Sequence, residues 1–263
     1  MTDIQLNPLN SNQRRLLQLG AVLVLVVFLI IFFLVSRKSQ NITVKNNTVY
    51  LQEAKLYLFD EVIPVNQYPD RIIFHYPYLT VVKPEQQKSL VYNLDTKLKE
   101  KEINQAVLDY FKGNRLYNIG NTTYFDKLDL GVLCEKGFIK NIGEVLCITK
   151  INKNNVENKL VLIDINTKKS KDIYISKELL TDVSVINNVI YLGEIDLYTN
   201  KSYVLVNNDR LEASDVVSLI YEMSGKVYFA SYKSAFNGQK EGYYLVDSGK
   251  SVKQEDGKII LFK

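Results

Sequence analysis

The chain has 263 residues, 46% of them apolar and 24% charged, a balance ordinary for a folded protein and sufficient for one large or two small folded units. Its net charge of +4 is small, and lysines outnumber arginines 27 to 6, which suits bidentate phosphate recognition poorly, so we expect no nucleic-acid partner. One histidine, two cysteines and no tryptophan exclude histidine-rich metal sites, disulfide-stapled miniature folds and tryptophan-lined sugar platforms.

The first predicted element is an apolar segment long enough to cross a membrane. Seventeen of the twenty residues from Leu16 to Val35 are Leu, Val, Ile or Phe, and none is charged. As a helix these residues would span roughly 30 Å, the thickness of the hydrocarbon core. We therefore predict a transmembrane helix over residues 16–36 and expect the lipid bilayer as a partner. Its membrane-spanning positions include Leu16, Leu19, Leu25, Ile30, Phe33 and Val35.

A cleaved signal peptide, a twin-arginine export signal at Arg14-Arg15 and a buried core helix are the competing interpretations of this segment. The span is longer than the apolar part of a cleaved signal, runs directly into Ser36-Arg37-Lys38, and lacks the polar stripe of a helix packed on one side. Basic residues flank it on both sides, so charge barely fixes its orientation. We favour an uncleaved signal-anchor in the cell (plasma) membrane, single-pass, with residues 1–15 as a short cytoplasmic tail.

The rest of the chain predicts one all-β extracytoplasmic domain over residues 48–263, after a polar tether at residues 37–47. Short runs of Val, Ile, Tyr and Phe alternate with clusters of Asn, Gly, Asp and Lys, and no window of 12 or more residues has a convincing helical period. Residues 104–112 and 176–182 are the two candidates for a turn or two of helix.

Two motifs recur through this domain. In the first, a tight turn precedes an apolar and aromatic strand, as in residues 46–51, 120–125, 187–192, 224–229 and 256–261. In the second, a strand enters an Asp-x-Thr-like turn and leaves as a more polar strand, as in residues 90–97, 160–168, 194–201 and 243–250. An Asp side chain can accept hydrogen bonds from backbone amides two residues on, which would fix such turns.

The alternation of these motifs resembles the blades of β-propeller repeat proteins, particularly the quinoprotein-like repeat in which an apolar strand leads into an Asp-x-x-Thr-Gly-Lys outer hairpin. Here the hairpins read Asp164-Ile165-Asn166-Thr167-Lys168-Lys169 and Asp196-Leu197-Tyr198-Thr199-Asn200-Lys201, and the likeness spans residues 45–263. It implies a propeller-like fold. At about 40 residues a blade the length gives about five blades, with a distorted six as an alternative and a β-sandwich as the alternative fold.

The ends of the domain are compatible with ring closure. The strand near Val49 and the final strand, residues 258–263, could complete one sheet together and hide edges that would otherwise template aggregation.

The sequence contains few candidate catalytic or ligand-binding residues. His75 is the only imidazole, and no Gly-x-Ser-x-Gly elbow accompanies it, so we expect a strand histidine with a structural partner. Three pairs of carboxylates stand close in the sequence, and we expect them to be solvated acids near turns rather than cation or catalytic sites. They are Asp60 with Glu61, Asp126 with Asp129, and Glu194 with Asp196. We predict no catalytic residue, cofactor or metal.

Cys134 and Cys147 form the one candidate disulfide. If a hairpin turned about Lys140-Asn141, the two side chains would face each other, and outside the cytoplasm such a pair could oxidise. Two apolar thiols packed in neighbouring strands are the alternative.

These features favour a membrane-anchored, propeller-like module for protein binding or scaffolding, with one or more protein partners in a bacterial envelope assembly. Heavy use of Lys, Asn and Ile is typical of an AT-rich bacterial genome, and eighteen tyrosines suit a protein interface. The alternative is an anchored hydrolase or lyase acting on an envelope polymer through carboxylates near the centre of the ring. Ligand sensing across the membrane is disfavoured by the short tail.

Overall fold

The structure is a computed structural model, and it describes residues 47–65, 70–151, 157–207, 209–213, 216–231, 242–246 and 258–263. These residues form strands β1 to β23 and a single 3-10 turn, η1 (Pro84–Gln86), so the all-β prediction is confirmed. The helix expected over residues 16–36 lies outside them. Within the described part, no helix is both long and apolar enough to span a membrane.

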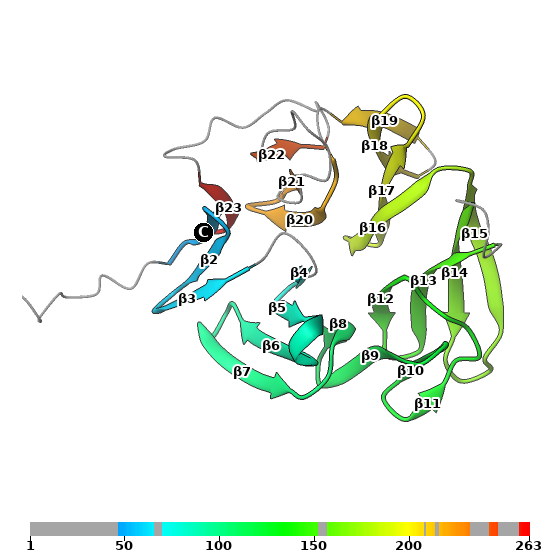
Figure 1. The fold of residues 1–263 in the computed structure, drawn as a ribbon, viewed down its shortest axis with the longest axis horizontal. Helices are drawn as coiled ribbons and strands as arrows, with labels where there is room; N and C mark the ends of the chain where they lie inside the picture. Colours follow the sequence, from blue (N-terminus) through cyan, green and yellow to red (C-terminus); the bar gives the residue numbers. More distant parts are fainter. Residues whose placement is uncertain are drawn as a thin grey trace, which may run out of the picture. The chain divides into compact units, whose positions relative to one another are not determined.

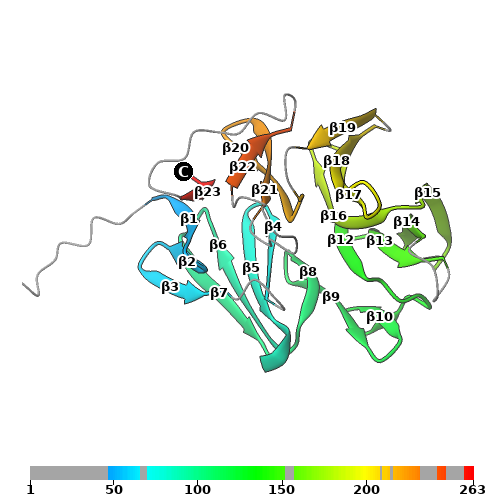
Figure 2. The ribbon, with the colours of Figure 1, turned by 45° about the horizontal axis from the view of Figure 1, so that its top comes forward.

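The strands form six small antiparallel sheets, which we number as blades in chain order (Figure 1). Blade 1 contains β23 (Ile259–Phe262), β1 (Val49–Gln52), β2 (Lys55–Leu58) and β3 (Glu61–Pro64). Blade 2, whose strands lie side by side in Figure 2, contains β4 (Arg71–His75), β5 (Tyr78–Lys83), β6 (Lys88–Asn93) and β7 (Leu98–Ile103). Blade 3 contains β8 (Val107–Phe111), β9 (Asn114–Ile119), β10 (Thr122–Phe125) and β11 (Leu128–Asp129).

The second half of the ring repeats the arrangement. Blade 4 contains β12 (Lys136–Asn141), β13 (Glu144–Lys150), β14 (Asn158–Asp164) and β15 (Ser170–Ser176). Blade 5 contains β16 (Leu179–Ile186), β17 (Val189–Asp196), β18 (Lys201–Val206) and β19 (Asp209–Ala213). Blade 6 contains β20 (Leu219–Met223), β21 (Lys226–Ser231) and β22 (Gly242–Leu245).

The blades surround a common axis, which makes the fold a six-bladed β-propeller (Figure 1). The first strands of blades 2 to 6 contact one another in cyclic order, and β20 contacts both β4 and β23. Blade 1 packs between blades 6 and 2 in one apolar cluster that includes Leu56, Phe74 and Tyr221. The propeller prediction is confirmed, the β-sandwich is wrong, and the count of about five blades is wrong.

The blade count failed because the blades differ in length. The first strands of blades 2 to 6 begin at Arg71, Val107, Lys136, Leu179 and Leu219. Blade 3, which starts at Val107, is much shorter than the assumed 40 residues because its strands and turns are short. This compact blade and the short blade 1, formed by residues 49–64 and β23, leave room for a sixth.

The ring closes as the sequence predicted, by pairing of strands from the two ends of the domain. Strand β1 pairs with β23 in antiparallel register, with Tyr50 opposite Ile260 and Leu51 opposite Ile259. Because β23 supplies the innermost strand of blade 1, neither β1 nor β23 is left with its pairing edge open on that side.

The two segments that were candidates for helix are strands instead. Residues 104–112 contain β8, and residues 176–182 contain the end of β15 and the start of β16. Both β8 and β16 are innermost strands of their blades, and each carries a buried or half-buried aspartate that interrupts the apolar pattern of a strand.

The first recurring motif corresponds to turns of the expected kind. Asn187 and Asn188, between β16 and β17, have φ angles of 52° and 63°, and Ser224 and Gly225, between β20 and β21, have 52° and 73°. Such positive angles are typical of two-residue hairpins whose twist matches the strands.

Two of the four predicted Asp turns are capped by Asp. In residues 90–97 the Asn93 side chain accepts from the Asp95 and Thr96 amides instead, and Asp247 lies outside the described residues. The Asp164 carboxylate accepts a hydrogen bond from the Thr167 amide at 2.8 Å, and Asp196 accepts from the Tyr198 amide at 2.8 Å. These turns hold the pKa of both carboxyls below the usual range, mainly through Thr167 and Thr199. The Asp164 turn joins the two outer strands of blade 4, as the resemblance implies, whereas the Asp196 turn joins the second and third strands of blade 5.

The alternation of strands defines two faces of the ring. We call the start face the side on which the first strand of each blade begins, and the end face the opposite side. Connections between blades and turns between second and third strands therefore lie on the start face. Asn47, the first described residue, accepts a hydrogen bond from Lys97 in the β6–β7 turn. The N-terminal end of the described domain therefore lies on the end face.

Candidate functional site

Two aspartates on the innermost strands join neighbouring blades. Asp109 of β8 accepts a hydrogen bond from the backbone amide of Ile139 in β12 at 2.7 Å. In the same way Asp182 of β16 accepts from the amide of Ile220 in β20 at 2.8 Å. Each aspartate follows a shift in strand register, and such bulges re-aim side chains. The two aspartates thus accept hydrogen bonds from backbone amides of the next blade, which strand pairing within a blade does not satisfy.

His75 lies at the end of β4, in contact with Asp109. Its Nδ1 is 3.0 Å from Asp109 Oδ2, and its ring stacks between Phe111 and Phe138 with centroid distances of 4.0 and 4.1 Å. The imidazole therefore ties blades 2, 3 and 4 together, which confirms the expectation of a strand histidine with a structural partner.

Three charged side chains line a narrow axial cavity of about 30 Å³, room for one or two water molecules: Arg71, Lys136 and Asp182. Arg71 donates to the carbonyl oxygen of Val107 at 2.9 Å. Burial lowers the pKa of the Lys136 ammonium, the Asp182 carboxylate opposes that shift, and the Arg71 guanidinium adds to it. Two basic side chains and one carboxylate therefore line this cavity.

A larger hollow of about 370 Å³ opens on the start face between blades 4, 5 and 6. Most of its exposed lining is apolar. Leu179 is half-buried there, whereas Leu180, Ile195, Val216 and Val217 lie beneath the surface, each 8% exposed or less. Polar groups come from Asn158, Thr181 and Ser218, and from Glu135 and Lys150, whose charged groups pair at 3.4 Å. Lys136 lines both this hollow and the axial cavity.

The carboxylate pairs noted in the sequence serve separate structural contacts. Glu61 accepts a hydrogen bond from the Tyr92 hydroxyl at 2.7 Å, and burial together with this bond raises the pKa of Tyr92. Asp126 accepts from the Arg115 amide and Asp129 from the Gly131 amide, at 3.0 and 2.6 Å. Among the described residues, no three His, Cys, Asp or Glu side chains gather as metal ligands would.

Glu194 departs from the expectation of solvated acids. Its side chain is 1% exposed, and it forms an ion pair with Arg210 at 2.8 Å and accepts a hydrogen bond from the Ser176 hydroxyl. Its neighbour Asp196 remains at the surface. The two carboxylates share a strand, but Glu194 is held under the outer strands of blades 4 and 5, so they do not act as a pair.

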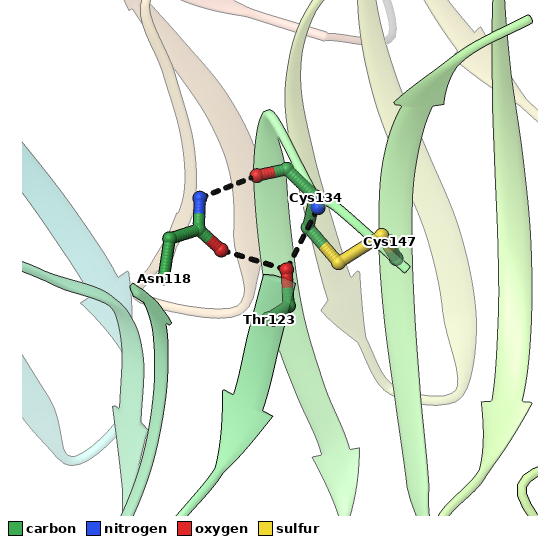
Figure 3. The surroundings of a disulfide bond; sticks show 4 residues. All are labelled: Asn118, Thr123, Cys134 and Cys147. Atoms are coloured by element: carbon green, nitrogen blue, oxygen red, sulfur yellow. Dashed lines mark hydrogen bonds between the residues drawn. A yellow bond between two sulfur atoms is a disulfide. The ribbon is translucent and has the colours of Figure 1, made fainter. Parts of the chain in front are cut away.

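Cys134 and Cys147 are joined by a disulfide (Figure 3). Cys147 lies in β13, but the hairpin turns at Ile142-Gly143 rather than at Lys140-Asn141, which places Gly137 opposite Cys147. Cys134 instead lies in the segment that enters blade 4. The predicted hairpin geometry is therefore wrong, because the Asn141 side chain accepts a hydrogen bond from the Gly143 amide and fixes a later turn.

Blade 3 holds the Cys134 segment in place (Figure 3). The Cys134 amide donates to the Thr123 hydroxyl at 2.8 Å, and the Asn118 amide group donates to the Cys134 carbonyl oxygen at 2.9 Å. The disulfide and these bonds together connect the second and third strands of blade 3 to the second strand of blade 4.

Most of the tyrosines in the described residues pack inside or between blades. Tyr221, Tyr228 and Tyr243 form a buried aromatic cluster in blade 6, and the Tyr221 hydroxyl donates to the Ile260 carbonyl oxygen at 2.7 Å. Tyr198 is the contrasting case, because its side chain is 96% exposed.

The start face carries a set of exposed apolar residues that the sequence patterns did not point to. We call Ile119, Ile151, Leu197 and Tyr198 the apolar tips. They lie at the turns between the second and third strands of three consecutive blades, 3, 4 and 5. An apolar residue inside a predicted polar turn is the signal that could have found them.

Comparisons with known proteins agree on architecture. No family model and no curated protein matches the chain. The chain is similar to a structure of the Nidogen/Laminin complex, with a TM-score of 0.50 and 9% identity over 82% of this chain and 96% of that one. It is also similar to hydrazine synthase of Kuenenia stuttgartiensis, with a TM-score of 0.43 and 12% identity over 77% and 74%.

A third similarity, to the beta-propeller domain of Cps50 (Swd1) from Myceliophteria thermophila, has a TM-score of 0.41 and 10% identity over 72% of this chain and 73% of that one. At such low identities the likeness concerns the fold alone. The described residues between Asn47 and Lys263 form a six-bladed β-propeller.

Proposed function

We propose that this protein is a single-pass, membrane-anchored module that presents its propeller outside the cytoplasm to a protein partner in the cell envelope. The uncharged apolar segment from Leu16 to Val35 supports the anchor. The Cys134–Cys147 disulfide supports an oxidising compartment, because such bonds are rare in reducing cytoplasm.

The observation that carries the binding function is the placement of the apolar tips. Four exposed apolar side chains on three consecutive blades face the same side, on turns held by a closed ring. Exposed apolar side chains gathered on one face are typical of protein interaction surfaces, and tyrosine is enriched at their centres. A rigid ring presents such turns without a large cost in ordering.

The nidogen/laminin structure that shares the fold is itself a complex. At 9% identity this similarity gives no partner for the present chain, and it supports the proposed use only through the shared fold.

Affinity capture with paired variants tests the proposal. The full-length protein is captured from its own cells in mild detergent, together with a Leu197→Asp/Tyr198→Asp variant and an Ile142→Asp variant. Ile142 is 67% exposed on the end face, so it is a matched apolar control. We expect a stoichiometric partner with the wild type and Ile142→Asp, and its loss with the double variant. Equal recovery from all three, or no partner at all, would contradict the proposal.

Protease protection tests the location separately. Protease added to intact cells, with the outer membrane permeabilised where the cell has one, is expected to digest the propeller down to the anchor. Protection in intact cells followed by digestion after lysis would place the domain in the cytoplasm and remove the envelope role.

A further inference from the structure

The hollow on the start face has the chemistry of a ligand site. Its volume of about 370 Å³ lies within the range of small-molecule sites, roughly 300 to 1,000 Å³. Its walls are mainly apolar, with a few polar groups, which is the usual composition of a site that binds an apolar group and orients it.

A cation lies where the hollow meets the axial cavity. Lys136 lines both spaces, and its ammonium interacts with Arg71 and Asp182 on the axial side. Because burial disfavours the charged form of Lys136, a single anionic group entering from the hollow would stabilise that form and balance its charge. The rim lysine, Lys150, is already paired with Glu135.

Thr181, which also lines the hollow, has a hydroxyl without a protein partner in the described part of the chain. The Thr181 hydroxyl oxygen is buried and, within the described residues, makes no hydrogen bond. A buried hydroxyl of this kind is uncommon, because an unmet hydrogen bond destabilises the folded state.

The backbone is shaped to place this hydroxyl. Leu180 pairs with Glu194 and Asp182 pairs with Gly193, so Thr181 is the extra residue of a bulge in β16. Thr181 therefore lines the hollow while Asp182 lines the axial cavity. A Cβ on Gly193 would lie 2.5 Å from the Thr181 hydroxyl oxygen, so the bare glycine lets Thr181 sit against β17.

From this arrangement we propose that the hollow binds an aliphatic carboxylate. Its apolar group lies against the walls that include Leu179, Leu180 and Ile195, and its carboxylate meets the Lys136 ammonium. On binding, the Thr181 hydroxyl, which is buried in the structure, turns toward the carboxylate and donates a hydrogen bond to it. The ligand is either a free carboxylic acid or the C-terminal residue of a peptide. The inference does not rest on the proposed protein partner, since a chain without that partner could still hold a free acid.

Ligand-observed NMR on the full-length protein in lipid nanodiscs tests the site without any mutation. The probes are 4-methylpentanoate and its neutral amide, which have the same shape. We expect the carboxylate to bind at least about tenfold more tightly than the amide, because a hydrogen bond to a charged group is worth more than a neutral one. Equal binding of acid and amide, or binding of neither, would overturn the proposal.

Variants locate the binding. Lys136→Met is expected to weaken 4-methylpentanoate binding by about tenfold or more, and Lys136→Arg to retain most of it. Lys140→Met removes the same charge from the same strand outside the hollow and is the matched control. Thr181→Val keeps the side-chain shape and should weaken binding about threefold or more. Unchanged affinity in a folded Lys136→Met protein would contradict the site.

Peptides distinguish the two sources of carboxylate. Gly-Val-Leu with a free C-terminus and the same peptide with an amidated C-terminus are titrated alongside the free acid. If the peptide with the free C-terminus binds and the amidated peptide does not, the ligand is a peptide C-terminus. If 4-methylpentanoate binds and neither peptide does, the ligand is a small free acid. In either case the Lys136→Met variant should weaken the binding that is observed.

Discussion

Buried aspartates between blades carry much of the cohesion of this ring. Neighbouring blades of a propeller share no strand pairing, so amides on the innermost strands need partners from side chains. Asp109 supplies one for Ile139 while also contacting His75 and the Tyr110 amide. One carboxylate thus serves three elements, and its loss would leave three groups unmet at once.

Replacing Asp109 should therefore be costly. We expect Asp109→Ala to lower the free energy of unfolding by about 3 kcal/mol, because it removes the acceptor from several buried donors. Asp172→Ala removes an exposed carboxylate paired with Lys159 at 3.0 Å and should cost less than about 1 kcal/mol. Urea unfolding of both variants checks this, and similar midpoints for the two would argue against the role given to Asp109.

Tyr110 makes the fold sensitive to alkali. Burial, together with a hydrogen bond to Glu100, raises the pKa of its hydroxyl to about 12, above its ordinary value of 10.0. A raised folded-state pKa stabilises the fold below the unfolded value, and that stability is lost as pH rises through the folded value. Stability should therefore fall between pH 10 and about 12, and Tyr110→Phe should reduce this fall.

Unfolding midpoints measured from pH 9 to about 12 test this contribution. Tyr198→Phe, at a fully exposed position, is the control and should leave the alkaline slope unchanged. An identical slope in wild type and Tyr110→Phe would show that other groups, among them the buried Tyr221, account for the whole effect.

For individual residues, only part of the candidate site could be predicted from the sequence. The structural role of His75 followed from its being the only imidazole. The roles of Asp109, Lys136 and Thr181 could not be predicted, because each depends on a contact with another blade or on a bulge. Such contacts join residues far apart in the chain and leave no local pattern.

Among the elements, several second and third strands were predictable, whereas the innermost strands β8 and β16 were not. Strands β10, β17 and β21 follow turn residues and contain unbroken apolar and aromatic runs, as the first motif requires. Innermost strands β8 and β16 include Asp109 and Asp182, which break such runs. One side of an innermost strand meets the axis and neighbouring blades, so its pattern resembles neither a buried strand nor an exposed one.

One turn departs from the residues its geometry favours. Glu53 and Ala54 connect β1 to β2 with φ angles of 49° and 57°, a conformation that Asn and Gly adopt more easily. The double change Glu53→Asn/Ala54→Gly should raise stability by about 1 kcal/mol. The reverse change, Gly225→Ala at a φ of 73°, should lower it by a similar amount. Thermal midpoints measure both, and a shift of the same sign in the two variants would refute the explanation.

For the whole molecule, the sequence predicted the propeller and its closure but not the number of blades. Closure was predictable because apolar strands stand at both ends of the domain, near Val49 and Ile259. Blade number depends on how far each hairpin extends from the axis. The short β11 in blade 3 shows how strongly that varies.

The closing strand should respond to substitution according to which side chain faces inward. Leu261 is 0% exposed in the cluster between blades 6, 1 and 2, whereas its neighbour Ile260 is half-buried. We expect Leu261→Ala to lower the free energy of unfolding by about 3 kcal/mol and Ile260→Ala by about 1 kcal/mol. Chemical denaturation compares them, and a larger effect at Ile260 would contradict the register of β23 with β1.

Pairing of β1 with β23 also sets the order of events during synthesis. Strand β1 leaves the ribosome early, while its inner partner is made only after the five other blades. Throughout that interval the nascent chain exposes an open, apolar strand edge, which is the kind of edge that recruits strands from other chains. Blade 1 can therefore be completed only after β23 has been made, and we expect the unfinished ring to be most prone to aggregation until then.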